Sequence, residues 1–155
     1  MCIRDRCLIA LAGIDVRTQL LPDGLTLPLL WSGLLLALLP LFVTADQAIV
    51  GAAIGYLSLW SVYWLFKLLT GKEGMGYGDF KLLGALGAWF GVGAILPIIL
   101  LSSVVGALVG GTLMALRGQD SQVPMPFGPF IAAAGFVYLI FAPQIGAWLP
   151  MFAIR

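Results

Sequence analysis

The sequence predicts an all-α fold, a polytopic transmembrane helical bundle of about five to six membrane segments. Of its 155 residues, 61% are hydrophobic and 10% are charged, whereas soluble domains are about half apolar and a quarter charged. Long apolar runs alternate with short polar or Pro/Gly-rich stretches, as in membrane bundles. The net charge of +1 and the lack of a basic stripe exclude a nucleic-acid partner, and the apolar composition indicates a lipid bilayer.

The chain begins with a polar stretch that does not fit the rest. Residues 1–6 carry three charged side chains, and the apolar run 7–14 that follows is far shorter than the roughly 20 residues of a spanning helix. We therefore expect residues 1–6 to be an atypical N-terminus that is foreign to the fold. Residues 7–155 are expected to form one membrane domain.

Polar and glycine-rich interruptions divide the remainder into elements. Charged residues and proline mark a loop at 15–24, and glycines mark a second loop at 70–79. Glycines at 91 and 93 end the short helix between the second loop and the third span. The expected apolar segments, in order, are 25–43, 47–69, 80–90, 94–116 and a last span that follows 126–129 and ends near Leu149.

Aromatic side chains gather near the end of the second span and at the end of the short helix. They are Trp60, Tyr63, Trp64, Phe66 and Trp89. Tryptophan and tyrosine are enriched where a helix meets the membrane–water interface. We expect these residues to be interface anchors.

Two aspartates stand at the ends of apolar runs. Asp15 follows the run 7–14, and Asp79 precedes the run 80–90. A carboxylate near lipid is costly, so an unpaired one is a functional candidate. Basic residues occur around the loops that hold both aspartates and not at 44–47 or 91–93, which places both aspartates on the cytoplasmic side. The hairpin of the first two spans returns the chain to that side, so the carboxyl groups can meet.

Two adjacent carboxyl groups can hydrolyse a peptide bond without a metal ion. Like charges a few ångström apart do not both ionise easily, so one group stays protonated while its partner takes a proton from water. The sequence has no histidine and only two cysteines, which disfavours a metal site and excludes a histidine-dependent triad. Glycines 74, 76 and 78 are expected to adopt positive φ and to position an extended substrate beside the loop.

Three motifs then resemble one family. The run GYGDFKL at 76–82 resembles the GxGD-x-K signature of bacterial type IV prepilin peptidases, which are membrane aspartic proteases. Asp15, with Pro22 and Asp23 after it, is similar to the first catalytic loop of that family. The run PFGP at 126–129 resembles its late P-F-G-P segment.

The resemblance covers about residues 8–149 and implies a function. Asp15 and Asp79 map to the catalytic pair, and Lys81 to a possible supporting residue. The implied reaction is cleavage of the leader of type IV pilus prepilins or type II secretion pseudopilins, at the cytoplasmic face of the bacterial inner membrane. The paired CxxC region of complete members is not present in this sequence. Cleavage needs no cofactor, and S-adenosylmethionine is implied only if an N-methyltransferase activity is retained.

Each candidate residue also has a structural interpretation. Asp79 could cap a helix that starts at Phe80, and Asp15 could be an ordinary interface residue. Asp23 fits a turn or cap, and Lys81 could extend to the interface.

Two other functions remain open at this stage. A proton-coupled transporter would also use membrane carboxylates, and an inactive peptidase-like fragment would keep only the fold.

Overall fold

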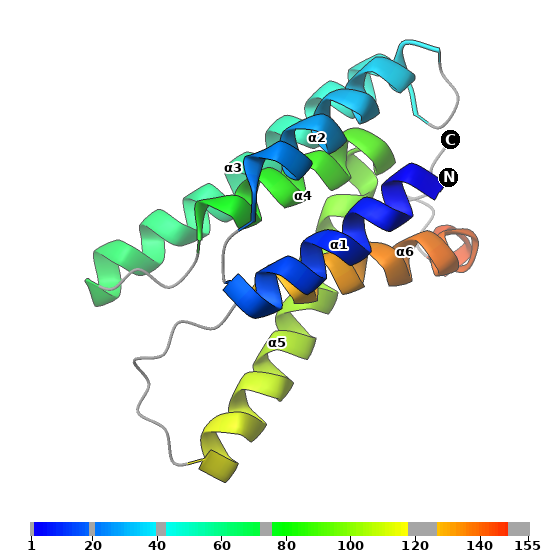
Figure 1. Cartoon of the computed structure of the whole chain (residues 1–155). Helices are drawn as coiled ribbons and strands as arrows, with labels where there is room; N and C mark the ends of the chain where they lie inside the picture. The colour runs from blue at the N-terminus through cyan, green and yellow to red at the C-terminus, as the bar shows by residue number, and fades with distance from the viewer. Residues whose placement is uncertain (1, 19–20, 40–42, 72–75, 118–126, 149–155) are drawn as a thin grey trace.

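The computed structural model describes residues 2–18, 21–39, 43–71, 76–117 and 127–148, and every regular element within these ranges is a helix (Figure 1). The elements in chain order are α1 (Cys2–Thr18), α2 (Asp23–Ala37), α3 (Ala45–Thr70), α4 (Tyr77–Phe90), the short 3-10 helix η1 (Val92–Ala94), α5 (Ile95–Arg117) and α6 (Gly128–Trp148). The predicted all-α class is therefore confirmed.

Helix α4 is the centre of the bundle. Apart from Lys81, every residue from Asp79 to Phe90 is buried, and α4 packs against α2, α3, α5 and α6. A helix that is apolar on all sides is suited to such a position. Gly91 ends α4 with a positive φ of 77° and a ψ of 179°, as the glycine interruption predicted. Its N–H donates to the Gly87 carbonyl at 2.9 Å.

Small residues bring α3 and α4 into backbone contact. Gly51 and Gly87 face each other so closely that a Cβ on either would overlap the carbonyl oxygen of the other. One turn along, a Cβ on Gly55 would lie 2.8 Å from the Leu83 carbonyl oxygen. Small-residue interfaces of this kind are typical of helix packing in membranes, where close van der Waals contact replaces the hydrophobic driving force.

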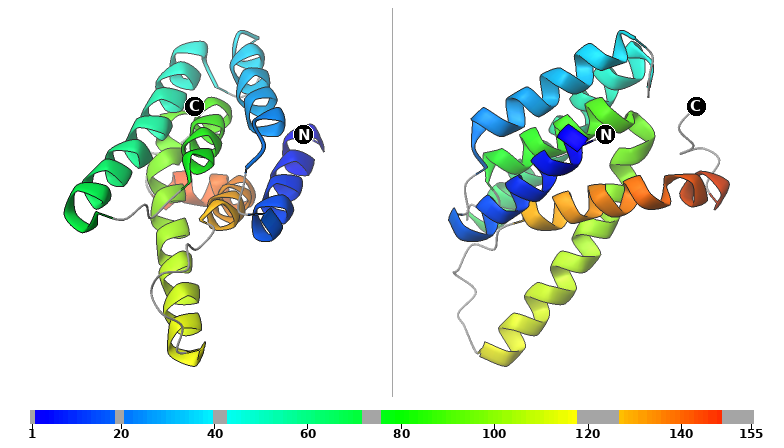
Figure 2. Two further views of the ribbon diagram at one scale, coloured as in Figure 1. Left: turned by 60° about the vertical axis from the view of Figure 1, so that its left-hand side comes forward. Right: turned by 45° about the vertical axis from the view of Figure 1, so that its right-hand side comes forward.

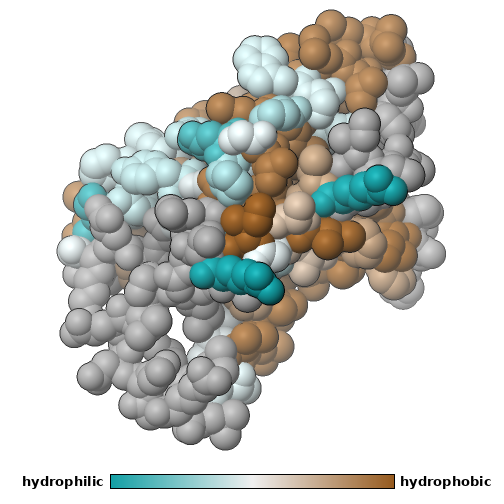
Figure 3. All heavy atoms as spheres, viewed as in Figure 1, coloured by the Kyte–Doolittle hydropathy of each residue, from teal (hydrophilic) through white to brown (hydrophobic). Residues whose placement is uncertain are grey.

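Two of the described helical segments are long and apolar enough to cross a membrane, Ala45–Leu69 and Val92–Thr112. Most of their residues are exposed rather than packed inside the protein. Large hydrophobic side chains also cover much of the surface; Leu38, Leu68 and Leu69 are at least 67% exposed. Figure 3 shows the same distribution on one face, where hydrophobic residues dominate and hydrophilic ones form isolated patches. Such a surface is matched to lipid rather than to water.

Several helix ends come together at one end of the molecule. The C-terminal end of α1 and the N-terminal ends of α2 and α4 lie toward the left of Figure 1. Both views of Figure 2 show α6 beside α1, with the N-terminal end of α6 near the C-terminal end of α1. Helix α5 leaves this bundle and extends away from it (Figure 2).

Three local expectations are wrong. The predicted loop at 15–24 is mostly helical, because α1 continues to Thr18 and α2 already begins at Asp23. Trp89 is not an interface anchor: it is 6% exposed, and its indole N–H donates to the Leu29 carbonyl at 2.9 Å. Tyr63 is also buried, whereas Trp60, Trp64 and Phe66 are at least 40% exposed.

The expectation about residues 1–6 stays a prediction. Residues 2–6 belong to the same helix as residues 7–18.

The glycine contact between α3 and α4 leads to a stability prediction. In Gly87→Ala, the new methyl group meets the Gly51 backbone, so the helices must separate. We expect a loss of about 1–3 kcal/mol, as for overpacked cores, measured by thermal unfolding in detergent. Gly111→Ala is the matched control, because no described residue lies within 4 Å of its added Cβ; it should be neutral or slightly stabilising. Equal stability of the two variants would contradict this packing.

Candidate active site

The site is formed by two buried carboxyl groups from different helices. Asp15 lies in the last turns of α1 and is 3% exposed, and Asp79 is the third residue of α4 and is 4% exposed. Both lie outside the two candidate membrane spans. Buried carboxylates are rare unless they are paired or hydrogen-bonded, so their surroundings decide what they can do.

The first residue of α6 lies between them. A Cβ added to Gly128 would be 3.0 Å from Cγ of Asp15 and 3.1 Å from Oδ1 of Asp79, and it would overlap Oδ2 of Asp15. Both carboxyl groups therefore lie over the same Cα atom and are neighbours. Helix α6 packs against both α1 and α4, which explains how it joins the two aspartates.

Burial and mutual repulsion shift the acidity of this pair. Burial raises the pKa of Asp79 from 3.8 to about 7, and the nearby charge of Asp15 contributes to this rise. The Gly76 N–H donates to the Asp79 carboxyl group and lowers the pKa by a smaller amount. Burial also raises the pKa of Asp15, although the Gly128 N–H donates to its carboxyl group and opposes the shift. Near neutral pH the pair can therefore hold one proton, which is the state suited to acid–base chemistry.

Asp79 does not cap the helix in the way that the sequence indicated. Helix α4 starts at Tyr77 with Gly76 as its N-cap, and not at Phe80. Asp79 is therefore in the first turn, and its carboxyl group reaches back to the Gly76 N–H, as the acidic residue of a capping box does. The contact orients the carboxyl group and is compatible with a role in chemistry.

Asp15 has spare hydrogen-bonding capacity. Its Oδ2 is buried and, within the described part of the chain, has no hydrogen-bond partner. A buried carboxylate oxygen without a partner is costly, so this oxygen is available to accept a hydrogen bond.

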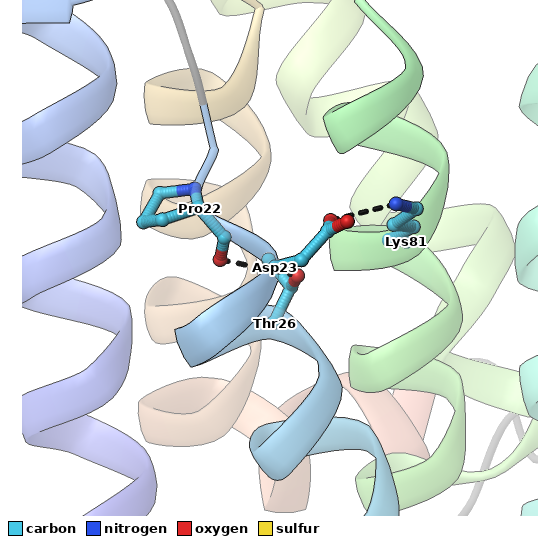
Figure 4. A network of polar contacts seen from close by, with 4 residues as sticks. All are labelled: Pro22, Asp23, Thr26 and Lys81. Carbon is cyan, nitrogen blue, oxygen red and sulfur yellow. Dashed lines mark hydrogen bonds and ion pairs between the residues drawn. The ribbon is translucent and has the colours of Figure 1, made fainter.

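Lys81 contacts a different acidic residue from the buried pair. Its Nζ lies 2.6 Å from Oδ1 of Asp23 (Figure 4), which is the first residue of α2. The side chains are 33% and 57% exposed, so the ion pair contributes modestly, about 0–1 kcal/mol. It joins the start of α2 to the start of α4. Thr26 completes this network by donating to the Pro22 carbonyl at 3.4 Å (Figure 4).

The glycines before Asp79 serve purposes other than positive φ. Among the described glycines only Gly71 and Gly91 have positive φ, so this expectation is wrong for Gly76 and Gly78. Gly76 is extended, with φ −80° and ψ 148°, and no described residue lies within 4 Å of the position that a Cβ would take. A side chain would not fit at Gly78, because its Cβ would lie 2.6 Å from Cβ of Leu21. Gly74 lies outside the described residues.

Sequence reasoning missed one component of the site, Gly128. It stands in the PFGP motif at 126–129, and that motif is the signal that could have found it. A cluster of aromatic rings joins the start of α4 to α3, since the ring centroids of Tyr63, Tyr77 and Phe80 lie 5.5–5.6 Å apart. Within the described ranges, no group of three or more His, Cys, Asp or Glu residues is arranged to hold a metal ion.

Comparison with known proteins identifies similar sequences. A family model described as the type IV leader peptidase family matches residues 6–111. Prepilin leader peptidase/N-methyltransferases from Xanthomonas campestris pv. campestris and Aeromonas hydrophila are 59% and 57% identical to the chain over 130 and 141 residues. The corresponding protein of Pseudomonas aeruginosa is 58% identical over 139 residues.

These matches cover most of the chain but only part of each relative. They span 84%, 91% and 89% of this chain and 45%, 49% and 48% of the three relatives, in the same order. The chain therefore spans about half the length of the relatives that it matches. No solved structure matches the chain.

The raised pKa of Asp79 predicts how stability depends on pH. Because the pKa in the folded protein lies above the ordinary 3.8, the folded state favours the protonated group. This stabilisation is complete below about pH 3.8 and is lost as pH rises through about 7. We expect thermal stability to fall over this interval and the fall to be smaller in Asp79→Asn. The exposed Asp46 provides the control: Asp46→Asn should retain the full dependence. An unchanged slope in Asp79→Asn would show that Asp79 is not the titrating group.

Proposed function

Because the chain belongs to the type IV leader peptidase family, we propose that it is a membrane aspartic endopeptidase that removes the leader from type IV prepilins or pseudopilins. The observation that carries this proposal is the meeting of Asp15 and Asp79 over Gly128. The printed names of the relatives, prepilin leader peptidase/N-methyltransferase, support the choice of substrate. The family and the geometry thus point to the same pair of residues.

The proposed mechanism uses the two carboxyl groups as acid and base. The ionised group removes a proton from a water molecule, whose oxygen attacks the carbonyl carbon of the scissile peptide bond. The protonated group donates its proton to the carbonyl oxygen. As the tetrahedral intermediate collapses, the carboxylate that gave up its proton takes one back from a hydroxyl group of the intermediate. The C–N bond breaks, and the nitrogen of the leaving amine takes the proton that the other carboxyl group had removed from water. One water molecule is consumed, and each aspartate returns to its starting state.

We further propose that the segment 74–78 positions the substrate. Gly76 supports this role because it is extended and exposed, and among the described residues nothing lies within 4 Å of the position that a Cβ would take. A peptide strand can therefore approach its backbone. Tyr77 is 56% exposed beside it. Lys81 supports the site indirectly, because its ion pair with Asp23 holds the N-terminal end of α2 against α4.

The charges near the helix ends support a cytoplasmic active site in the bacterial inner membrane. Arg17 and Lys67 are in the last turns of α1 and α3, and Lys81 is in the first turns of α4. Positive residues are retained on the cytoplasmic side of a membrane. We therefore place the buried aspartates at that side, where the leader of a prepilin would be accessible.

The second activity in the names of the relatives is not extended to this chain. The carboxyl groups of Asp15 and Asp79 are suited to hydrolysis. S-adenosylmethionine would be needed only if methyl transfer is retained. For cleavage we propose that neither a metal ion nor an organic cofactor is needed, because two carboxyl groups supply both proton transfers.

A cleavage assay with matched variants tests the pair. In membranes that contain a prepilin, Asp15→Asn and Asp79→Asn should each lower cleavage by about 10²–10⁴-fold or more, because each removes one proton transfer. Asp46→Asn is the control, and all variants should remain in the membrane fraction. Cleavage by Asp79→Asn at a near-normal rate would eliminate the two-aspartate mechanism.

Chelation tests the proposed independence from metal. Incubation with EDTA before addition of the prepilin should leave the cleavage rate unchanged, since proton transfer between carboxyl groups and water involves no Lewis acid. Loss of cleavage in EDTA that returns with added Zn²⁺ or Mg²⁺ would refute a metal-free reaction.

A further inference from the structure

The start of α6 has a role that the proposed mechanism leaves unassigned. We propose that Gly128 is a positioning residue of the site, whose missing side chain lets the two carboxyl groups meet and whose N–H group orients Asp15. The effect of Gly128 on catalysis rests on the proposed function. The contact between Gly128 and the two carboxyl groups does not depend on any substrate.

The space over Gly128 is filled by the carboxyl groups themselves. The position that a Cβ would take lies against Oδ2 and Cγ of Asp15 and 3.1 Å from Oδ1 of Asp79. Its φ is not in the left-handed region, because only Gly71 and Gly91 are there among the described glycines. The requirement for glycine is therefore steric and comes from the aspartates, not from the backbone conformation.

The backbone of Gly128 also contributes a hydrogen bond. Its N–H donates to the Asp15 carboxyl group, whereas the N–H groups of Phe130 and Ile131 both donate to the Phe127 carbonyl. Pro129 has no N–H group. In the first turn of α6, it is therefore the Gly128 N–H that donates to the carboxyl group of Asp15. This is the N-terminal end of the helix, where the macrodipole favours a negative charge.

Neighbouring contacts hold Gly128 in this place. A Cβ on Gly106 of α5 would lie 3.3 Å from the Phe127 ring. The lack of a side chain at Gly106 therefore leaves room for Phe127, which directly precedes Gly128. Two turns into α6, a Cβ on Gly135 would lie 3.0 Å from the Leu86 side chain of α4. Helix α6 is therefore seated on both α4 and α5, and a shift of its first residue would displace the carboxyl groups.

Kinetics with matched alanine variants provide the first test. Gly128→Ala should lower kcat for prepilin cleavage by about 10²-fold with little change in KM, because small displacements of catalytic groups have costs of this order. The bell-shaped pH profile should also narrow, since carboxyl groups that are pushed apart repel each other less. Gly111→Ala, whose added Cβ has nothing within 4 Å among the described residues, should stay within a few-fold of the wild type. Equal kcat and pH profile in Gly128→Ala and the wild type would overturn the proposal.

A thermal-unfolding cycle tests the same contact without substrate, and so separates this inference from the proposed function. Gly128→Ala should lower Tm in the wild-type background and have a much smaller effect in the Asp15→Ala background, where the clashing carboxyl group is gone. An equal loss of Tm in both backgrounds would refute the proposal, even if prepilin is cleaved. If prepilin is not cleaved, the proposed function fails, but the cycle still decides the role of Gly128.

Discussion

The meeting of two carboxyl groups over one glycine is the constraint that the packing of the whole bundle has to satisfy. Asp15 and Asp79 repel each other when both are ionised and lose hydration when buried. They stay together only because the helices that carry them are held by other contacts. Gly128 provides the space, and the N–H groups of Gly76 and Gly128 offset part of the cost. The packing of the bundle thus sustains an arrangement that the aspartates would not adopt by themselves.

That packing relies on small residues at each helix crossing. Gly51 and Gly87 bring the backbones of α3 and α4 into contact, and Gly135 brings α6 close to α4. Burial of α4 fixes Asp79, which is in its first turn. In a bundle with a largely apolar surface, such close contacts hold helices together where a hydrophobic driving force is weak. The exposed ion pair of Lys81 with Asp23 adds a further contact between the starts of α2 and α4.

The all-α class and the proximity of Asp15 and Asp79 could be predicted from the sequence, because apolar runs and isolated carboxyl groups are local signals. It also indicated the glycine stop at Gly91 and the break before α6. Other features depend on contacts between helices and have no local signal. The run after Asp15 appears polar, yet α1 continues to Thr18. Trp89 was expected at an interface but finds a hydrogen-bond partner inside the bundle. The role of Gly128 emerges only when three helices converge.

Infrared spectroscopy of the carboxyl groups would test the central claim most directly. The C=O stretch of a protonated, buried carboxylic acid would be followed against pH in the wild type and in Asp79→Asn, without substrate. The shared-proton account predicts one buried carboxyl proton that persists to near neutral pH in the wild type, with a midpoint near the Asp79 pKa of about 7, and that is lost or strongly shifted in the variant. Full ionisation of every carboxyl group by about pH 5, or an unchanged signal in Asp79→Asn, would contradict it.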